Sequence, residues 1–376
     1  MIIGIPKETK IHEYRVGATP EMVKLFTMNG HQVLVQSNAG ANVGFLDEHY
    51  RTAGAKIVFS PQEVFKAELI LKVKELQDDE FAYIFPGQII FSYLHLAPDL
   101  NQTKQLIEKK VIAIAYETVT DEKNRLPLLI PMSEIAGRIA IQAGATALQM
   151  NQGGKGLLLG GVPGVAPAKV TIIGGGVVGT EAARMALGLG SQVYILDNNL
   201  NRLRELDILF NSRLHTIYSS PSAIETMVKE SDLVIGAVLV PGKTAPRLVT
   251  RSMIKQMSPG SVVVDVAIDQ GGCFETSKPT NHDNPTYVVD GIVHYCVTNM
   301  PGACARTATV ALTHATTPYA LSIANKGYKI AMKENVGLMH GLNVCLGKIT
   351  NEAVAHDLGF EYTAPATMIC DSLSCE

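Results

Sequence analysis

The chain has 376 residues, of which 47% are hydrophobic and 18% are charged, and its formal net charge at pH 7 is -3. This length and apolar content predict about two globular domains, each with its own core. Basic residues (32 Lys plus Arg) do not outnumber acidic ones (35 Asp plus Glu), so the composition indicates no nucleic-acid partner.

The sequence also predicts no membrane segment and no metal site. No uninterrupted apolar run approaches the roughly 18 residues that a membrane-spanning helix needs, and the N-terminal MIIGIPKETK has its charges on the wrong side for a signal peptide. The six cysteines lie in the last third of the chain without C-x-x-C or Cys/His spacing, which favours reduced thiols. We therefore expect a cytoplasmic protein.

The N-terminal third alternates short apolar runs with helical segments. Thr19 is placed to cap a helix at 20–29, with Pro20 in its first turn and Gly30 after its end. This alternation predicts a first α/β domain with its own sheet. The predicted strands are 2–5, 32–35, 55–58, 68–73, 88–94 and 111–115, and the helices are 47–53, a short one after Pro61, and 99–109.

A second domain is predicted after a loop at 120–131, a helix at about 133–149 and a glycine-rich connection at 151–169. Strands and helices alternate again, which predicts a doubly wound parallel sheet. From about Ala305 the sequence predicts helices to its end, and the pattern leaves open which domain they join. The strands are 169–173, 192–196, 214–218, 232–235 and 261–265, and the helices are 177–189, 222–230 and 250–257.

The most informative motif is G-x-G-x-x-G at Gly174, Gly176 and Gly179, between a buried strand and a helix. Gly174 allows a tight turn, Gly176 lets the backbone approach a pyrophosphate, and Gly179 lets the helix pack closely on the sheet. Asp197 ends the next strand, where its carboxylate would accept from both ribose hydroxyls of adenosine and repel a 2′-phosphate. The motif therefore predicts an NAD site.

Four ionisable residues lie at strand ends or in the loop after the first strand: Arg15, Lys74, His95 and Asp269. Reacting groups of open α/β sheets lie at such edges, so these are candidate site residues, and the active site is expected in a cleft that separates two Rossmann-like, doubly wound domains. Each residue also has a plainer interpretation as a solvated side chain. Asp265 competes with Asp269 as the important carboxylate.

Ten separated segments, in order, resemble alanine dehydrogenase along nearly the whole chain. The resemblance implies an NAD-dependent enzyme that oxidatively deaminates L-alanine to pyruvate and ammonium and also runs the reverse reductive amination. It implies a substrate domain of residues 1–128 and 305–376, an NAD-binding Rossmann domain of residues 129–304, and a homohexamer. The segments are GIPKE (4–8), EYRVGATP (13–20), LKVKE (71–75), YLHLAP (93–98), PMSEIAGR (131–138), GGKG (153–156), GVPGV (161–165), the glycine motif, DVAIDQGG (265–272) and NMPG (299–302).

The resemblance also implies a role for each candidate residue. Arg15 and Lys74 correspond to the cations that bind the substrate carboxylate, His95 to the catalytic acid–base group, and Asp269 to a second catalytic residue that stabilises positive charge on nitrogen. The positions that align with cofactor contacts are Ser133, Gly174, Gly176, Val177, Val178, Gly179, Asp197, Arg202, Ser219, Val238, Leu239, Val266, Ala267, Ile268, Asp269, Lys278, Val297, Thr298, Asn299 and Met300.

The sequence leaves two other functions open: the nucleotide-binding subunit of a transhydrogenase, and an NAD-binding regulatory protein without turnover. His95 argues against the first, because transhydrogenases that share this fold lack a histidine at that place. The presence of all four candidate site residues argues against the second. The motifs do not settle side-chain selectivity, because one methylene in an apolar pocket is worth only about 1–3 kcal/mol.

Overall fold

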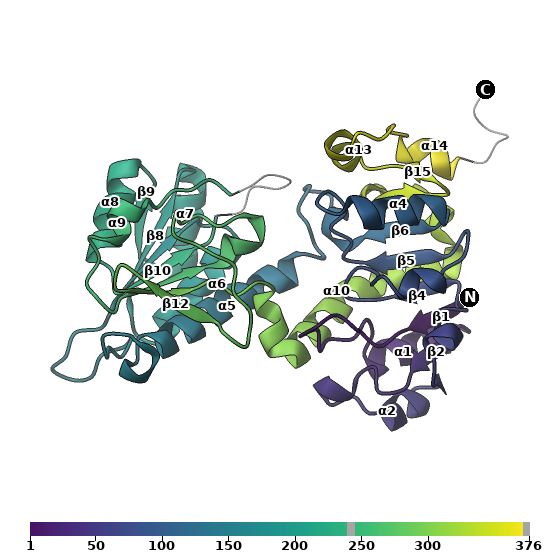
Figure 1. Cartoon of the computed structure of the whole chain (residues 1–376), viewed down its shortest axis with the longest axis horizontal. Helices are drawn as coiled ribbons and strands as arrows, with labels where there is room; N and C mark the ends of the chain where they lie inside the picture. Colours follow the sequence, from purple (N-terminus) through teal and green to yellow (C-terminus); the bar gives the residue numbers. More distant parts are fainter. Residues whose placement is uncertain (239–244, 371–376) are drawn as a thin grey trace. The chain divides into compact units, whose positions relative to one another are not determined.

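The structure is a computed structural model that describes residues 1–238 and 245–370. The chain divides into two compact units, each built on its own sheet (Figure 1). Unit 1 comprises Met1–Pro131 and the segment that begins at Cys304, and unit 2 comprises Met132–Ala303. The C-terminal segment therefore returns to the N-terminal unit.

In unit 1 the described residues form an eight-stranded sheet in the order β15-β14-β6-β5-β4-β1-β2-β3. The strands from β1 to β6 pair in parallel, and their order reverses between β1 and β4, which makes the sheet doubly wound. The strands are β1 (Ile2–Ile5), β2 (Gln32–Gln36), β3 (Lys56–Val58), β4 (Leu69–Leu71), β5 (Ile89–Ser92), β6 (Ile112–Ala115), β14 (Leu342–Cys345) and β15 (Lys348–Ile349).

Helices connect these strands as the sequence predicts. In α1 the hydroxyl of Thr19 accepts a hydrogen bond from the backbone N–H of Met22 at 3.3 Å, Pro20 lies in the first turn, and Gly30 follows the helix with a φ of 83°. The helices of this unit are α1 (Pro20–Met28), α2 (Asp47–Thr52), α3 (Pro61–Val64), α4 (Leu100–Glu108), α10 (Ala305–Lys326), α11 (Tyr328–Glu334), α12 (Val336–His340), α13 (Glu352–Leu358) and α14 (Pro365–Ile369), with 3-10 turns η1 (Ala41–Val43), η2 (Glu80–Ala82) and η3 (Tyr116–Thr118).

The expectation of helices to the end of the chain is wrong in one segment. After α12 the chain enters β14, which pairs antiparallel with β6, and then β15, which pairs antiparallel with β14. All four residues of β14 are buried. A buried run of four residues has no distinguishing periodicity, so only the free edge of β6 decides that it becomes a strand.

In unit 2 the described residues form a seven-stranded sheet in the order β12-β13-β11-β10-β7-β8-β9. Its parallel strands reverse order between β7 and β10, and only β12 runs antiparallel to its neighbour. The sequence did not predict β12 and β13. The strands are β7 (Lys169–Ile173), β8 (Gln192–Asp197), β9 (His215–Tyr218), β10 (Leu233–Gly236), β11 (Val262–Asp265), β12 (Thr286–Val289) and β13 (Ile292–Tyr295).

The helices of unit 2 pack around this sheet, and α7 was not predicted. The predicted helix at 250–257 is confirmed only as the short α9. The helices are α5 (Ile130–Ala147), α6 (Val177–Gly188), α7 (Leu200–Phe210), α8 (Pro221–Glu230) and α9 (Arg251–Ile254), with 3-10 turns η4 (Met150–Gln152), η5 (Val266–Gln270) and η6 (Met300–Cys304). Across residues 1–238 and 245–370, no helix combines the length and apolar character needed to cross a membrane.

Candidate functional site

Four charged or titratable residues gather at the carboxyl edge of the unit 1 sheet, the edge at which its parallel strands end. Lys74, His95 and Glu117 follow β4, β5 and β6 respectively, and Arg15 lies in the loop after β1. The strands β6, β5, β4 and β1 are neighbours in that order. The doubly wound topology therefore brings three of the predicted site residues to one edge, on both sides of the strand-order reversal.

Arg15 is buried, with 2% of its surface exposed, and Glu13 fixes its orientation. Its Nε donates to Oε1 of Glu13 at 2.7 Å, and a terminal nitrogen donates to Oε2 at 2.6 Å. Burial alone would raise the pKa of the Glu13 carboxyl, but the hydrogen bonds and charge of Arg15 hold that pKa below its usual range. The pair therefore presents a guanidinium whose plane is set before any ligand arrives.

The two lysines of LKVK differ sharply. Lys72 is fully buried, and its Nζ lies 2.7 Å from a carboxylate oxygen of Glu80 and 3.4 Å from one of Glu8. Lys74 is half-buried, and burial together with the charge of Arg15 lowers the pKa of its ammonium group. Lys72 is committed to an internal ion-pair network, whereas Lys74 lies within the electrostatic field of Arg15.

His95 has 49% of its side chain exposed and a left-handed backbone with a φ of 49°. Its backbone N–H donates to Oε1 of Glu117 at 2.6 Å, and its ring stacks on that of Tyr93 with centroids 6.0 Å apart. The Tyr93 hydroxyl is itself anchored, because it donates to the carbonyl of Leu128 at 2.6 Å. The imidazole is thus accessible to a ligand while the backbone that carries it is held.

Sequence reasoning missed Glu13 and Glu117, although both lie beside predicted residues. Glu117 follows a strand of the same sheet as His95, so the rule that drew attention to strand ends could have found it. Glu13 is two residues from Arg15, and nothing in the pattern distinguishes it from a solvated loop carboxylate.

The glycine motif of unit 2 has the geometry that a dinucleotide needs. Gly174 has a φ of 105°, and a Cβ on Gly179 would lie 1.9 Å from the carbonyl oxygen of Gly174, so the turn and the helix require glycine. A Cβ on Gly176 would meet no described atom within 4 Å. The outer side of the loop is therefore open, at the N-terminus of α6, where a pyrophosphate would bind.

Asp197 and Arg202 both form hydrogen bonds with this loop. One oxygen of Asp197 accepts from the backbone N–H of Gly175 at 2.8 Å. Arg202 donates to the carbonyl of Gly175 and to the hydroxyl of Thr180, each at 2.7 Å, and pairs with Glu205. A carboxylate has about four acceptor positions, so Asp197 can also accept from ribose. The guanidinium of Arg202 is therefore held by the glycine loop, by α6 and by α7.

The other predicted cofactor residues lie mainly at the carboxyl edge of the same sheet. Ser219 follows β9, Val238 follows β10, and the run 266–269 follows β11. The run 297–300 follows β13 after one intervening residue. These segments contain Val266, Ala267, Ile268 and Asp269, and Val297, Thr298, Asn299 and Met300.

The remaining predicted cofactor residues are Ser133, Lys278 and Leu239. Ser133 lies near the start of α5, in a helix that packs tightly on α6, because a Cβ on Gly137 would lie 2.2 Å from the carbonyl oxygen of Val178. Lys278 is exposed between β11 and β12, away from a strand end. Leu239 lies outside the described residues.

Asp265 and Asp269 have different environments. Asp265 is completely buried at the end of β11, and burial raises the pKa of its carboxyl. Its Oδ2 accepts from the backbone N–H of Cys273 at 2.9 Å and from the hydroxyl of Ser277 at 2.6 Å, and its Oδ1 accepts from the backbone N–H of Ala267 at 3.1 Å. Asp269 is exposed. Asp265 therefore holds the loop, and Asp269 is available to a ligand.

We expect Asp265→Asn to lower the free energy of unfolding by about 1–3 kcal/mol. The asparagine side chain has only one acceptor oxygen. Its NH₂ group would face some of the N–H or O–H groups that now donate to Asp265, and those groups would lose their hydrogen bonds. Denaturant unfolding of the whole protein measures the effect, as a shift in the midpoint between variants whose denaturant slopes are the same. Asp283→Asn, on the exposed surface, is the control. A midpoint equal to that of the wild type would show that the loop does not depend on this carboxylate.

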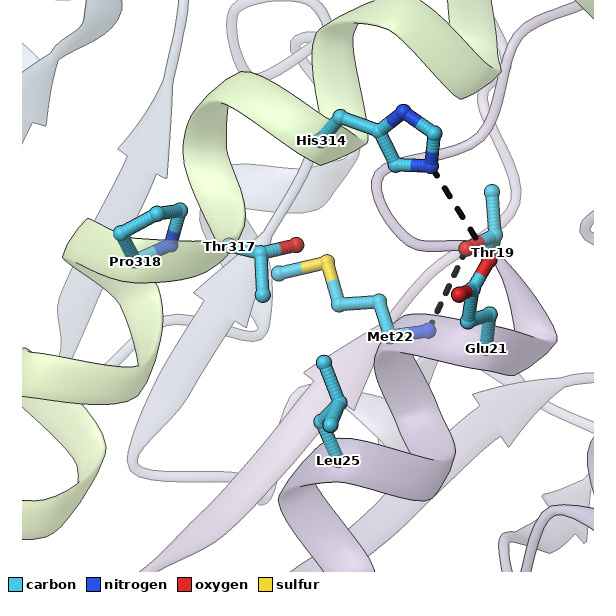
Figure 2. Close-up of a pocket in the computed structure, with 7 residues that line it drawn as sticks. All are labelled: Thr19, Glu21, Met22, Leu25, His314, Thr317 and Pro318. Carbon is cyan, nitrogen blue, oxygen red and sulfur yellow. Dashed lines mark hydrogen bonds and ion pairs between the residues drawn. The ribbon is translucent and has the colours of Figure 1, made fainter.

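A separate cavity of about 260 Å³ lies on unit 1 between α1 and α10 (Figure 2). At its edge Nε2 of His314 lies 3.9 Å from Oε2 of Glu21, and both side chains are largely exposed. None of the predicted site residues lines it, so we assign it no part in the chemistry. The lining residues are Thr19, Glu21, Met22, Leu25, His314, Thr317 and Pro318.

Comparison with known proteins agrees with this geometry. The family described as Alanine dehydrogenase/PNT, N-terminal domain matches residues 4–136, and Alanine dehydrogenase/PNT, C-terminal domain matches residues 140–352. The chain is 55% identical over 370 residues to an alanine dehydrogenase from Halomonas elongata, which covers 98% of this chain and 100% of that protein. It is 54% identical over 375 residues to an alanine dehydrogenase from Bacillus subtilis, covering 100% of this chain and 99% of that protein.

Solved structures give the same result. One described as L-alanine dehydrogenase has a TM-score of 0.93 at 51% identity and covers 96% of this chain and 99% of its own. A transhydrogenase from Sinorhizobium meliloti has a TM-score of 0.83 at 23% identity, covers 93% of this chain and 100% of its own, and shows a shared fold alone. With family matches over most of the chain and relatives at more than half identity, the chain belongs to the alanine dehydrogenase/PNT family.

Proposed function

We propose that the protein is an NAD-dependent L-alanine dehydrogenase, which converts L-alanine to pyruvate and ammonium and catalyses the reverse reductive amination. The observation that carries this proposal is the group of Arg15, Lys74 and His95 at one sheet edge, in a chain 54% identical over its full length to an alanine dehydrogenase. Two cations and an accessible histidine are the groups that an amino acid dehydrogenase needs for a carboxylate and a proton.

In this proposal Arg15 and Lys74 bind the substrate carboxylate. Glu13 fixes the guanidinium of Arg15, so little orientational freedom is lost when the anion binds. Lys74 adds a second positive charge in a half-buried environment, where Coulomb attraction is stronger than in water. Together they orient the substrate and the direction of its Cα–H bond.

His95 moves the protons of the reaction. Oxidation of the Cα–N bond gives an imine, water adds to it to form a carbinolamine, and ammonia leaves as pyruvate forms. His95 can accept a proton from the attacking water and return it to the leaving nitrogen. NAD, when bound, supplies the hydride acceptor. Asp269 carries the negative charge that stabilises the iminium nitrogen in this proposal.

The NAD assignment is supported by unit 2. The outer face of Gly176 is open at the start of α6, and Asp197 ends the next strand along from the glycine turn. Asp197 accepts from the ribose hydroxyls in this assignment and repels a 2′-phosphate. The predicted contacts Ser133, Val177, Val178, Ser219, Val238 and the strand-end runs complete the same proposed site.

We further propose a cytoplasmic homohexamer whose partners are small molecules, with no nucleic acid and no membrane. The support is the near-neutral charge balance and the resemblance to alanine dehydrogenases over the whole chain. The transhydrogenase subunit and the regulatory protein are less favoured. The transhydrogenase structure shares only 23% identity, and His95 suits proton transfer in imine chemistry.

Steady-state kinetics with a panel of substrates tests the proposal. We expect NADH formation with NAD and L-alanine, weaker rates with glycine and L-serine, no rate with L-glutamate, and a strong preference for NAD over NADP because of Asp197. NADH consumption with pyruvate and ammonium is the reverse control. A protein that binds NADH but turns over none of these substrates would instead fit the regulatory or transhydrogenase reading.

A further inference from the structure

Glu117 follows the strand next to the one that His95 follows, and its side chain contacts the backbone at His95. It lies in η3 (Tyr116–Thr118), directly after β6, and its side chain is 17% exposed. Its Oε1 accepts the backbone N–H of His95 at 2.6 Å and that of Leu94 at 3.1 Å. Its Oε2 lies 3.2 Å from the same Leu94 nitrogen. One carboxylate thus holds two consecutive peptide groups.

These two peptides belong to a strained turn. His95 has a φ of 49°, a left-handed conformation that residues with a side chain adopt infrequently and that persists only when the surroundings enforce it. The other side of the turn is also held, because the side-chain amide of Gln102 donates to the carbonyl of Leu94 at 2.9 Å. Glu117 supplies the charged half of this restraint, and charge-assisted hydrogen bonds are about twice as strong as neutral ones.

The same carboxylate lies close to the imidazole. Oε1 of Glu117 is 3.9 Å from Nδ1 of His95, too far for a hydrogen bond but close enough for attraction when the ring is protonated. The aromatic ring of Tyr93 stacks on the imidazole and so limits the positions that the His95 side chain can adopt. A half-exposed histidine would otherwise sample several rotamers.

We propose that Glu117 is a positioning residue for His95. It enforces the left-handed backbone at His95 through its two peptide N–H groups and keeps a negative charge beside the imidazolium that forms when His95 accepts a proton. This inference rests on the proposed alanine dehydrogenase function. It deepens that function, since Glu117 acts through His95 without touching the substrate.

Two variants separate the two parts of this role. Glu117→Ala removes both acceptors, and we expect kcat for alanine deamination to fall about 10–10²-fold, because misplacing a catalytic group by about 1 Å costs about that much. The KM for alanine should stay within about 3-fold, since Arg15 and Lys74 are untouched. Glu117→Gln keeps an acceptor oxygen for the peptides and should recover most of the loss, with the remaining deficit reporting the charge. Glu122→Ala, on the exposed loop beyond η3, is the matched control.

A double-mutant cycle shows whether Glu117 acts through His95. In a His95→Ala background, Glu117→Ala should add no further fall in kcat, because its target is gone. NADH affinity and unfolding midpoints confirm that each variant folds. A wild-type kcat in Glu117→Ala would overturn the proposal. So would a fall in kcat that is as large in the His95→Ala background as in the wild type.

The failure of the proposed function would be seen separately, as absent turnover in the wild type. In that case a crystal structure of Glu117→Ala decides the positioning role alone. It should show His95 out of its left-handed conformation, and a turn unchanged from that of the wild type would contradict the inference.

Discussion

Replacing His95 with alanine is expected to lower kcat for L-alanine deamination by roughly 10²–10⁴-fold, the usual loss when a general acid–base group is removed. The side chain is 49% exposed, so its removal creates no buried cavity and should leave the fold intact. NADH binding should stay near that of the wild type, because the glycine loop and Asp197 belong to unit 2. Single-turnover and steady-state rates measure the first effect, and fluorescence titration with NADH measures the second.

His314→Ala is the matched control for this experiment. His314 is also an exposed histidine of unit 1, but it lies beside the cavity between α1 and α10 (Figure 2). Its replacement should leave kcat unchanged. If His95→Ala retained wild-type turnover, the acid–base role would have to move to another residue, and Lys74 would be the next candidate.

Arg15→Lys is expected to lower kcat/KM for alanine and for pyruvate by about 10²-fold, which corresponds to about 2.7 kcal/mol of lost transition-state stabilisation. Lysine keeps the positive charge but loses the planar fork of donors, and the guanidinium orientation set by Glu13 is lost with it. Lysine is preferable to alanine here. Alanine would leave the Glu13 carboxylate buried without its cation, at a cost of about 3–5 kcal/mol in stability that would obscure the kinetic effect.

The loss should appear mainly in the KM for the carboxylate substrates, with the KM for NAD nearly unchanged. Arg51→Lys on the exposed surface of α2 is the control, because its partner Glu48 is also exposed. An unchanged KM for alanine in Arg15→Lys would show that the carboxylate binds elsewhere and that the Arg15–Glu13 pair is purely structural.

Much of the fold was predictable because local signals agreed with the global topology. Short apolar runs alternate with capped helices, so the parallel strands of both sheets, apart from β13, could be placed to within two or three residues. The turn at Gly174 and the packing at Gly179 could be predicted because both positions forbid a Cβ for reasons internal to the motif.

The features that could not be predicted depend on contacts between segments far apart in the sequence. The strand β14 forms because β6 has a free edge, which nothing within 342–345 reveals. Lys72 and Lys74 look alike in LKVK, and only the carboxylates of Glu8 and Glu80 around Lys72 distinguish them. The strand-end rule could have indicated Glu117 as a site residue, but the two residues are 22 positions apart and no sequence pattern shows that its carboxylate accepts the backbone N–H of His95.

In the proposed reaction, hydride passes from the Cα of L-alanine to NAD. The most direct measurement uses L-alanine deuterated at Cα and follows the deuterium by mass spectrometry of the reduced cofactor. We expect each NADH molecule formed to carry one deuterium, and pyruvate and ammonium to form in equal amounts. NADH that forms without deuterium, or no NADH at all from a protein that binds the cofactor, would contradict it.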